Sequence, residues 1–592
     1  MLKGSNNDKL LTIGVDEKYL VFYQRWQELL DKRTLDIHQY KIMNSFVAID
    51  ELISIINLSL TGVHTTDYNV RNCIQETSLI IDEDYVISKY FSTLVIPTRA
   101  QLKCLNKEKL SSQEKYKLMF HLQYVLKRLS LSYLNQSLEE LFAAISDSNY
   151  EVMNKCMYII ISQCIYNGWS TQGLLELLRF FVGEKSFSEK WNQFTYIISL
   201  GKVYHEVYIS IALKQNNSSA GTDSLKSLGF TVHNKEEIEE LYKDKCSIDR
   251  ELSSDKRYVS VCTQATDLVS AARQGICDIA EKMDIASFYN IIYPWDTKSV
   301  SIIVINTTSW FVRDFTGEEL YQTYDYIDSS NDIFLNTQVI FSNADKRGIQ
   351  NRLRGAFTYA NISRNSFFQE EKYLNMWVAL ESLSQSSMYN SDIENVKEFA
   401  ASALCLRYLY KLVRNFYEDC KRCKVNFTFS SISYNFADRS NKEIVITMIS
   451  ILKDKTLADE LKSKCNNNHL LKYRCDEVTV LLNDRKNIYK KIQKHNQRIR
   501  WQLQRLYRLR NEIAHSALHQ SSSLVIYIEH LYDYLACFIT EITMCHDMEN
   551  INTIEEIYSI LKDNYYIFET EINKEESDLI DNFYSSGIMD FI

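Results

Sequence analysis

Arg510 and His515 lie five residues apart near the end of a basic segment, and Asn511 directly follows the arginine. A guanidinium can hold a phosphate through two hydrogen bonds, and an imidazole exchanges protons near neutral pH. Together these groups supply what cleavage of an RNA strand by its own 2′-hydroxyl requires, without a metal ion. On a regular helix this spacing turns two side chains about 140° apart, so a shared site needs the reach of arginine, a bend or a partner subunit.

The five-residue spacing alone is weak evidence, because a motif this short also recurs by chance. Arg33 and His38 repeat the spacing. No basic segment leads into that N-terminal pair, so we interpret it as a coincidence. The alternative for Arg510 and His515 is an arginine near a helix end and a histidine whose ring makes ordinary structural hydrogen bonds.

Positive charge is concentrated in the segment that leads to Arg510. Residues 485–510 contain ten lysines and arginines and no acidic residue, although the whole chain has a formal net charge of −9 and a pI of about 5.8. Such a run is either a solvated helix face or a track for a phosphate backbone. We predict an RNA-binding track, and its candidate residues are Lys490, Lys491, Lys494, Arg498, Arg500, Arg505 and Arg508.

A candidate ion-pair partner for Arg510 is a carboxylate in the segment 367–383, FFQEEKYLNMWVALESL. The apolar residues of this segment form one helical stripe. Glu381 follows Trp377 by four positions and therefore lies at the edge of that stripe. It is a candidate partner that would hold the guanidinium of Arg510 in place. The alternative is an ordinary carboxylate at the rim of the core.

Several cysteines and one histidine have spacings that resemble metal sites. They are Cys420, Cys423, Cys465, His469 and Cys475. A structural zinc needs four ligands in a tetrahedron, and the second half of this set lacks a close ligand pair. We interpret the set as reduced structural cysteines, with zinc as the alternative. His515 and His519 are four apart but have no acidic third ligand, and the sequence contains no phosphate-binding loop motif, so we assign no metal and no cofactor.

The composition predicts a mainly helical protein with more than one domain. Two prolines and 14 glycines in 592 residues leave few of the breakers that turn-rich β folds need. Neither a secretory signal nor a membrane-spanning apolar run is apparent, so we expect a cytoplasmic protein without a membrane partner.

The first two expected domains differ in their periodicity. Helical spacing of apolar residues predicts an all-α domain over residues 1–225, which ends in a polar linker at 215–227. A small α/β domain, a candidate for sensing or regulation, follows over 226–345. Its expected strands are 230–233, 258–262 and 301–307, with a helix at 265–283.

The rest of the chain is again helical in pattern. Amphipathic helices over residues 361–548, among them a long basic helix at about 470–510, predict an antiparallel bundle. Residues 549–592 have the pattern of an acidic helical tail.

The segments KYLNMWVALESL and RNEIAH together resemble the HEPN superfamily, in particular its ApeA-like branch of bacterial anti-phage and abortive-infection proteins. The resemblance covers about residues 361–544. It implies a dimeric, metal-independent endoribonuclease in which His515 is the general acid and base and Arg510 binds the phosphate, with Asn511 as the polar residue after the arginine. A long cysteine-bearing insertion before the basic helix departs from the family pattern.

We therefore expect a toxin-like ribonuclease that cuts cellular RNA, with tRNA as one candidate substrate, and that responds to a phage-encoded trigger. A homodimer through the C-terminal bundle is expected. One alternative is a non-catalytic HEPN-like protein that binds RNA or another partner. A third hypothesis is a scaffold that forms a complex with a nucleotidyltransferase.

Overall fold

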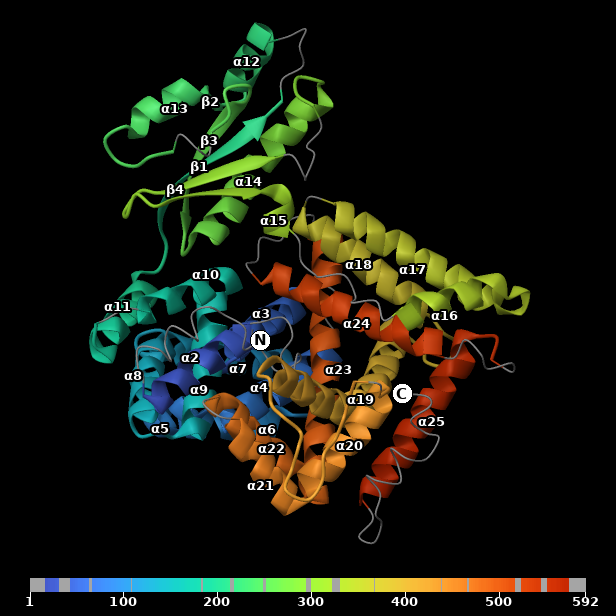
Figure 1. The fold of residues 1–592 in the computed structure, drawn as a ribbon. Coiled ribbons are helices and arrows are strands. Elements are labelled where there is room, and N and C mark those ends of the chain that lie inside the picture. Colours follow the sequence, from blue (N-terminus) through green and yellow to red (C-terminus); the bar gives the residue numbers. More distant parts are fainter. Residues whose placement is uncertain are drawn as a thin grey trace.

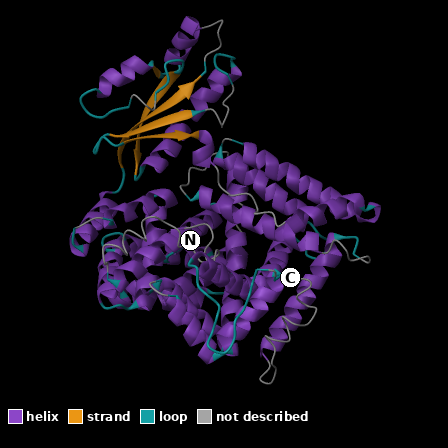
Figure 2. Cartoon of the chain, in the orientation of Figure 1, coloured by secondary structure: helices purple, strands orange, loops and turns teal. Residues whose placement is uncertain are grey.

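A computed structural model describes most of the chain. The described residues are 16–30, 43–62, 67–107, 109–182, 185–212, 218–248, 252–293, 300–321, 331–366, 368–437, 439–465, 468–516, 523–544 and 551–573. The fold is mainly helical and contains one small antiparallel sheet (Figures 1 and 2), which confirms the mainly α prediction. Among the described helices, none combines the length and the apolar character needed to cross a membrane.

The N-terminal unit is a compact set of helices around an aromatic core. Phe22, Trp26 and Phe194 are fully buried, and the rings of Trp26 and Phe194 lie 5.3 Å apart in an edge-to-face arrangement. The elements of this unit are α2 (Glu17–Leu30), α3 (Ser45–Leu60), α4 (Asp67–Glu83), α5 (Tyr85–Tyr90), α6 (Ser92–Leu105), α7 (Ser112–Leu129), α8 (Tyr133–Ser146), α9 (Tyr150–Tyr166), α10 (Thr171–Glu176), η1 (Leu177–Phe181) and α11 (Phe187–Leu200).

The middle unit is a five-stranded sheet with the order β2-β3-β1-β4-β5, in which every neighbouring pair is antiparallel. Helix α14 packs on one face and α13 on the other, and the unit projects from the helical body in Figure 1. The elements are β1 (Val203–Ile211), α12 (Ser218–Ser227), β2 (Thr231–His233), α13 (Lys235–Tyr242), β3 (Arg257–Ala265), α14 (Leu268–Phe288), β4 (Ser301–Asn306), β5 (Val312–Thr316) and α15 (Gly317–Tyr321).

The strands expected near 230, 258 and 301 are present, but the central strand β1 lies in a segment that we expected to be helical. Both faces of β1 are covered, so its sequence lacks the strict alternation that marks a half-buried strand. Gly275 allows α14 to approach closely, because a Cβ there would lie 2.7 Å from a methyl carbon of Val207 in β1. The sheet therefore begins before the boundary expected near residue 225, and the expected linker contains α12.

The C-terminal helices share one large core. Trp377 of α18 and Phe416 of α19 are among its largest fully buried side chains. The elements are α16 (Asn331–Ser342), η3 (Ala344–Lys346), α17 (Arg347–Asn365), α18 (Gln369–Ser384), α19 (Asp392–Arg422), α20 (Asn441–Lys453), α21 (Lys455–Lys464), α22 (His469–Leu482), α23 (Arg485–Ser516), α24 (Leu524–Met544) and α25 (Ile554–Asn573).

Three details of this region differ from the sequence-based expectations. The core already includes Ile340 and Leu353, so it starts before residue 361. The basic helix expected at 470–510 is two helices, because α22 ends at Leu482 and α23 begins at Arg485. Helix α25, in the expected acidic helical tail, is helical as expected but packs against α19 and α23 with its apolar side in the core, which therefore extends beyond residue 548.

Helix α23 lies between the two helical units. It contacts α19, α25, α18 and α22 of the C-terminal unit and also α4 of the N-terminal unit. Ile526 of α24 packs into the N-terminal core, and α2 packs against α22. The N-terminal unit therefore buries part of the helix that carries the candidate catalytic residues.

Candidate active site and the two halves of α23

The guanidinium of Arg510 is held by two side chains at the C-terminal end of α23. Its Nη1 donates a hydrogen bond of 2.9 Å to Oδ1 of Asn511, and its Nη2 lies 3.7 Å from Oε2 of Glu381. The Arg510 side chain is 31% exposed, and that of Glu381 is 23% exposed. The arginine is therefore oriented and still open to a ligand, and the pair that the position of Glu381 suggested is present.

Helix α18 fixes this end of α23. The hydroxyl of Tyr373 donates a hydrogen bond of 2.6 Å to the carbonyl of Leu506, and the ring of Trp377 lies 5.8 Å from that of Tyr507. Glu381 stands one turn after Trp377, at the edge of the buried stripe. Burial raises the pKa of Glu381, while the neighbouring Trp377 indole and the charge of Arg510 oppose this shift.

His515 belongs to the last turn of α23, and its imidazole is outside the described side chains. Because α23 remains helical through Ser516, positions 510 and 515 are about 140° apart around the helix axis. The backbone alone therefore does not bring the two positions to one face. His519, like the pair Arg33 and His38, lies outside the described residues.

The second half of the predicted RNA track is engaged in ion pairs. Arg505 contacts Oε2 of Glu51 at 2.8 Å and Oε2 of Glu76 at 2.6 Å, and Arg508 also pairs with Glu51. The Arg505 side chain is 7% exposed. We call these four residues the interdomain charge cluster, since the arginines come from α23 and the glutamates from α3 and α4.

Arg500 also forms an ion pair, in which its two terminal nitrogens donate to the two carboxylate oxygens of Glu398 on α19. Arg500, Arg505 and Arg508 therefore do not form an open basic surface in this structure. These ion pairs could not be anticipated from the sequence, because the carboxylate partners are about 100 to 460 positions away.

The interdomain charge cluster was missed by the sequence analysis. Arg505 and Arg508 lower the pKa of Glu51 against the opposing effect of burial, whereas burial raises the pKa of Glu76 in spite of Arg505. The available signal was Glu51, which with Asp50 is one of two carboxylates in the largely apolar helix SFVAIDELISIINLSL. A carboxylate that is mostly removed from water favours a cationic partner.

The first half of the predicted track is more open. Lys494 pairs with Glu83 of α4, and Arg498 lies 3.4 Å from the same carboxylate. Lys490 is exposed and has no ion-pair or hydrogen-bond partner among the described residues. Lys490, Lys491 and Lys494 line a cavity between the helical units.

The cysteines of the insertion lie in the core rather than around a metal-like centre. Cys420, Cys465 and Cys475 are buried, and Cys423 accepts a hydrogen bond of 3.2 Å from the Asn468 amide. No group of three or more His, Cys, Asp or Glu side chains in the described part of the chain is arranged to hold a metal ion. His469 points elsewhere, because its Nδ1 lies 2.8 Å from Glu17.

The chain matches no protein-family model, no curated protein and no solved structure.

Proposed function

We propose that the protein is a HEPN-like, metal-independent endoribonuclease whose cutting site is at the C-terminal end of α23. The observation that supports this most directly is the contrast among the arginines of this helix. Arg505 and Arg508 pair with carboxylates of the N-terminal unit and are 7% and 16% exposed, whereas Arg510 is oriented by Asn511 and Glu381 with 31% of its side chain exposed. A guanidinium that is positioned but accessible suits the binding of a phosphate.

In the proposed reaction, Arg510 binds the two non-bridging oxygens of the scissile phosphate. His515 removes the proton of the adjacent 2′-hydroxyl, whose oxygen attacks phosphorus, and the bond to the 5′-oxygen breaks. The leaving oxygen takes up a proton, from the same or a second histidine. The products are a 2′,3′-cyclic phosphate and a 5′-hydroxyl, and no metal takes part. Glu381 and Asn511 act as positioning residues for Arg510.

We further propose that the N-terminal unit restrains this nuclease, as a regulated anti-phage toxin would require. Support comes from the contacts of α4 and α3 with α23, since Glu51 and Glu76 pair with Arg505 and Arg508 just ahead of Arg510, and Glu83 pairs with Lys494 further back on the helix. An RNA that used Arg505 or Arg508 would have to displace these carboxylates. A phage-encoded trigger that separates α4 from α23 would therefore extend the basic surface next to the site.

A homodimer through the C-terminal unit remains part of the proposal. Positions 510 and 515 diverge on α23, so a second copy would supply the missing proton donor. Helix α16 offers an apolar surface for it, because Phe334, Leu335 and Val339 are 59%, 52% and 46% exposed.

The function is tested by sequencing RNA ends after induction of the wild-type protein, His515→Ala and the matched control Lys486→Ala. Lys486 is exposed on the same helix and lines neither cavity. We expect new 5′-hydroxyl ends with the wild type and the control and none with His515→Ala. RNA binding without cutting in the wild type would favour a non-catalytic RNA-binding protein, and cutting that EDTA abolishes and magnesium restores would contradict the mechanism.

Arg510→Lys tests the role of the planar guanidinium. Lysine retains the charge but cannot bind two phosphate oxygens in one plane, so we expect at least a tenfold loss of cleavage rate, about 1.4 kcal/mol. The unfolding free energy should change by less than about 0.5 kcal/mol, because the side chain is partly exposed. A cleavage rate within about threefold of the wild type would rule out bidentate phosphate binding.

A further inference from the structure

A cavity of about 730 Å³ lies between the two helical units. One wall comes from α2 and α9 of the N-terminal unit, and the other from α19, α22 and α23 of the C-terminal unit. Cavities that bind small organic ligands measure roughly 300 to 1,000 Å³. The cavity is therefore large enough for a ligand that touches both units.

Three lysines of α23, Lys490, Lys491 and Lys494, line this cavity. Lys490 is exposed and has no ion-pair or hydrogen-bond partner among the described residues, and Lys494 pairs with Glu83. Burial and the charges of Arg498 and Lys491 lower the pKa of His495, on the same helix, to about 3. An anion in the cavity would relieve this repulsion.

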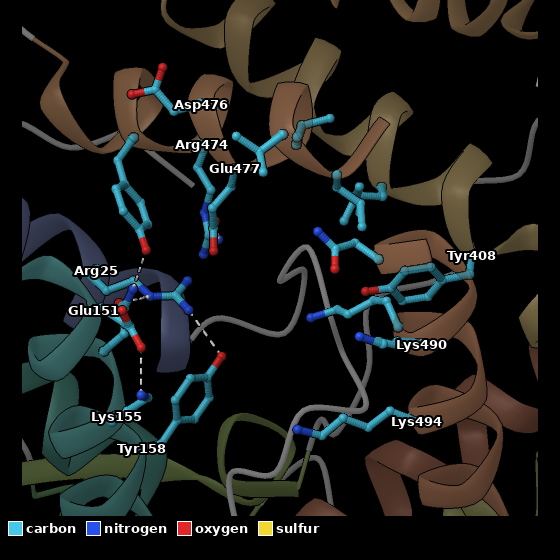
Figure 3. A pocket seen from close by; sticks show the side chains of 18 of the residues that line it. Arg25, Glu151, Lys155, Tyr158, Tyr408, Arg474, Asp476, Glu477, Lys490 and Lys494 are labelled. Atoms are coloured by element: carbon cyan, nitrogen blue, oxygen red, sulfur yellow. Dashed lines mark hydrogen bonds and ion pairs between the residues drawn. The ribbon is translucent and has the colours of Figure 1, made fainter. Parts of the chain in front are cut away.

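The other charged residues of the lining are largely paired with one another. Arg25 binds Glu28 and the hydroxyl of Tyr158, Arg474 contacts Glu28 at 2.9 Å, and Lys155 binds Glu151 at 2.6 Å. In Figure 3, Lys490 and Lys494 extend into the cavity from the side opposite Arg25 and Tyr158. The lysine side is therefore where a phosphate would bind.

Aromatic side chains line the same cavity. Tyr158 and Tyr473 are half-buried, on α9 and α22, and Tyr408 of α19 packs against the ring of His495 at 4.6 Å. Tyrosine faces are suitable surfaces for a heterocyclic base. Leu412 and Val478 add apolar contacts.

A second cavity of about 550 Å³ adjoins the first and shares Lys155, Tyr158, Lys491 and Lys494 with it. Its lining has as many carboxylates (Glu76, Asp82, Glu83 and Asp84) as cations (Lys155, Lys491, Lys494 and Arg498). The larger cavity has three carboxylates, Glu151, Asp476 and Glu477, against six cations, so the balance of charge there is more favourable for a phosphate-bearing ligand.

We propose that the larger cavity binds a nucleotide, with its phosphates at Lys490 and Lys494 and its base against Tyr158 and Tyr473. The proposal goes beyond the ribonuclease function. Lys490 and Arg510 are twenty residues apart on one helix, about 30 Å, so a mononucleotide in the cavity does not reach the proposed cutting site. Such a ligand acts as an effector that ties the N-terminal unit to α23.

The binding test uses isothermal titration calorimetry of the full-length protein with ATP as the probe. We expect saturable binding that weakens about tenfold in Lys490→Gln, since a charge-assisted contact to phosphate is lost. Lys486→Gln removes an exposed lysine one turn earlier on α23, outside the cavity, and should bind ATP like the wild type. Tyr473→Leu should also weaken binding about tenfold if the base stacks there. Unchanged secondary structure in each variant, by circular dichroism, excludes misfolding as the cause.

Two further ligands test the phosphate contacts and the base contacts separately. Inorganic tripolyphosphate should bind more weakly than ATP, and adenosine more weakly still. Tripolyphosphate binding as tightly as ATP would overturn the nucleotide assignment, and absence of ATP binding at millimolar concentration, or equal losses in Lys490→Gln and Lys486→Gln, would overturn the site. His515→Ala should bind ATP normally, so failure of the ribonuclease proposal and failure of this one can be distinguished.

Discussion

Both halves of α23 carry basic residues, but their surroundings differ. In the first half, Lys490 is exposed and Lys494 shares one glutamate with Arg498 at the edge of a cavity. In the second half, Arg505 is buried between two glutamates of the N-terminal unit. A run of basic residues therefore does not specify a nucleic-acid surface by itself, because the position of distant carboxylates determines which cations remain available.

The largest effect expected from this comparison is on stability. Arg505→Met would leave the carboxylates of Glu51 and Glu76 buried with too few partners, and we expect the free energy of unfolding to fall by about 3 to 5 kcal/mol. Chemical denaturation measures this. Lys486→Met, in the first half, should change it by less than about 0.5 kcal/mol. A loss below 1 kcal/mol for Arg505→Met would mean that water reaches the interdomain charge cluster.

A smaller effect concerns His495, which is buried in the first half of α23. Burial and nearby positive charges lower the pKa of His495 from its usual 6.5 to about 3, so the unfolded chain binds a proton between these values and the folded chain does not. Stability should therefore decrease as the pH falls through this window, by about 2 kcal/mol between pH 7 and pH 5. Urea unfolding at both pH values measures the decrease. In His495→Gln this contribution should be absent, and an equal decrease in both proteins would contradict the prediction.

The smallest effect is expected for the exposed pair of Lys494 and Glu83. Their side chains are 35% and 40% exposed, so Glu83→Gln should cost about 0.2 to 1 kcal/mol, and the cost should vanish in 1 M salt. Thermal unfolding at low and high salt measures this difference. If Glu83→Gln instead lowered the free energy of unfolding by several kcal/mol at any salt concentration, the pair with Lys494 would be as strongly stabilising as the interdomain charge cluster.

The sequence was most informative where local spacing determines position. The amphipathic patterns located α18, α19 and α24, and the four-residue step from Trp377 placed Glu381 at the edge of the core beside Arg510. Strand β1 was missed because a central strand is buried on both faces and loses its alternation. The partners of Arg505 could not be predicted, because an ion pair between residues 429 positions apart leaves no periodic pattern in either segment.

The separation between Glu76 and Arg505 also sets an order of events during synthesis. At roughly 5 to 20 residues per second, a ribosome makes the N-terminal helices about 20 to 90 seconds before it reaches the end of α23. Glu51 and Glu76 have thus been synthesised long before the arginines that they bind. Arg505 and Arg508 then follow only a few residues ahead of Arg510 and His515, so the carboxylates exist before any part of the proposed cutting site does.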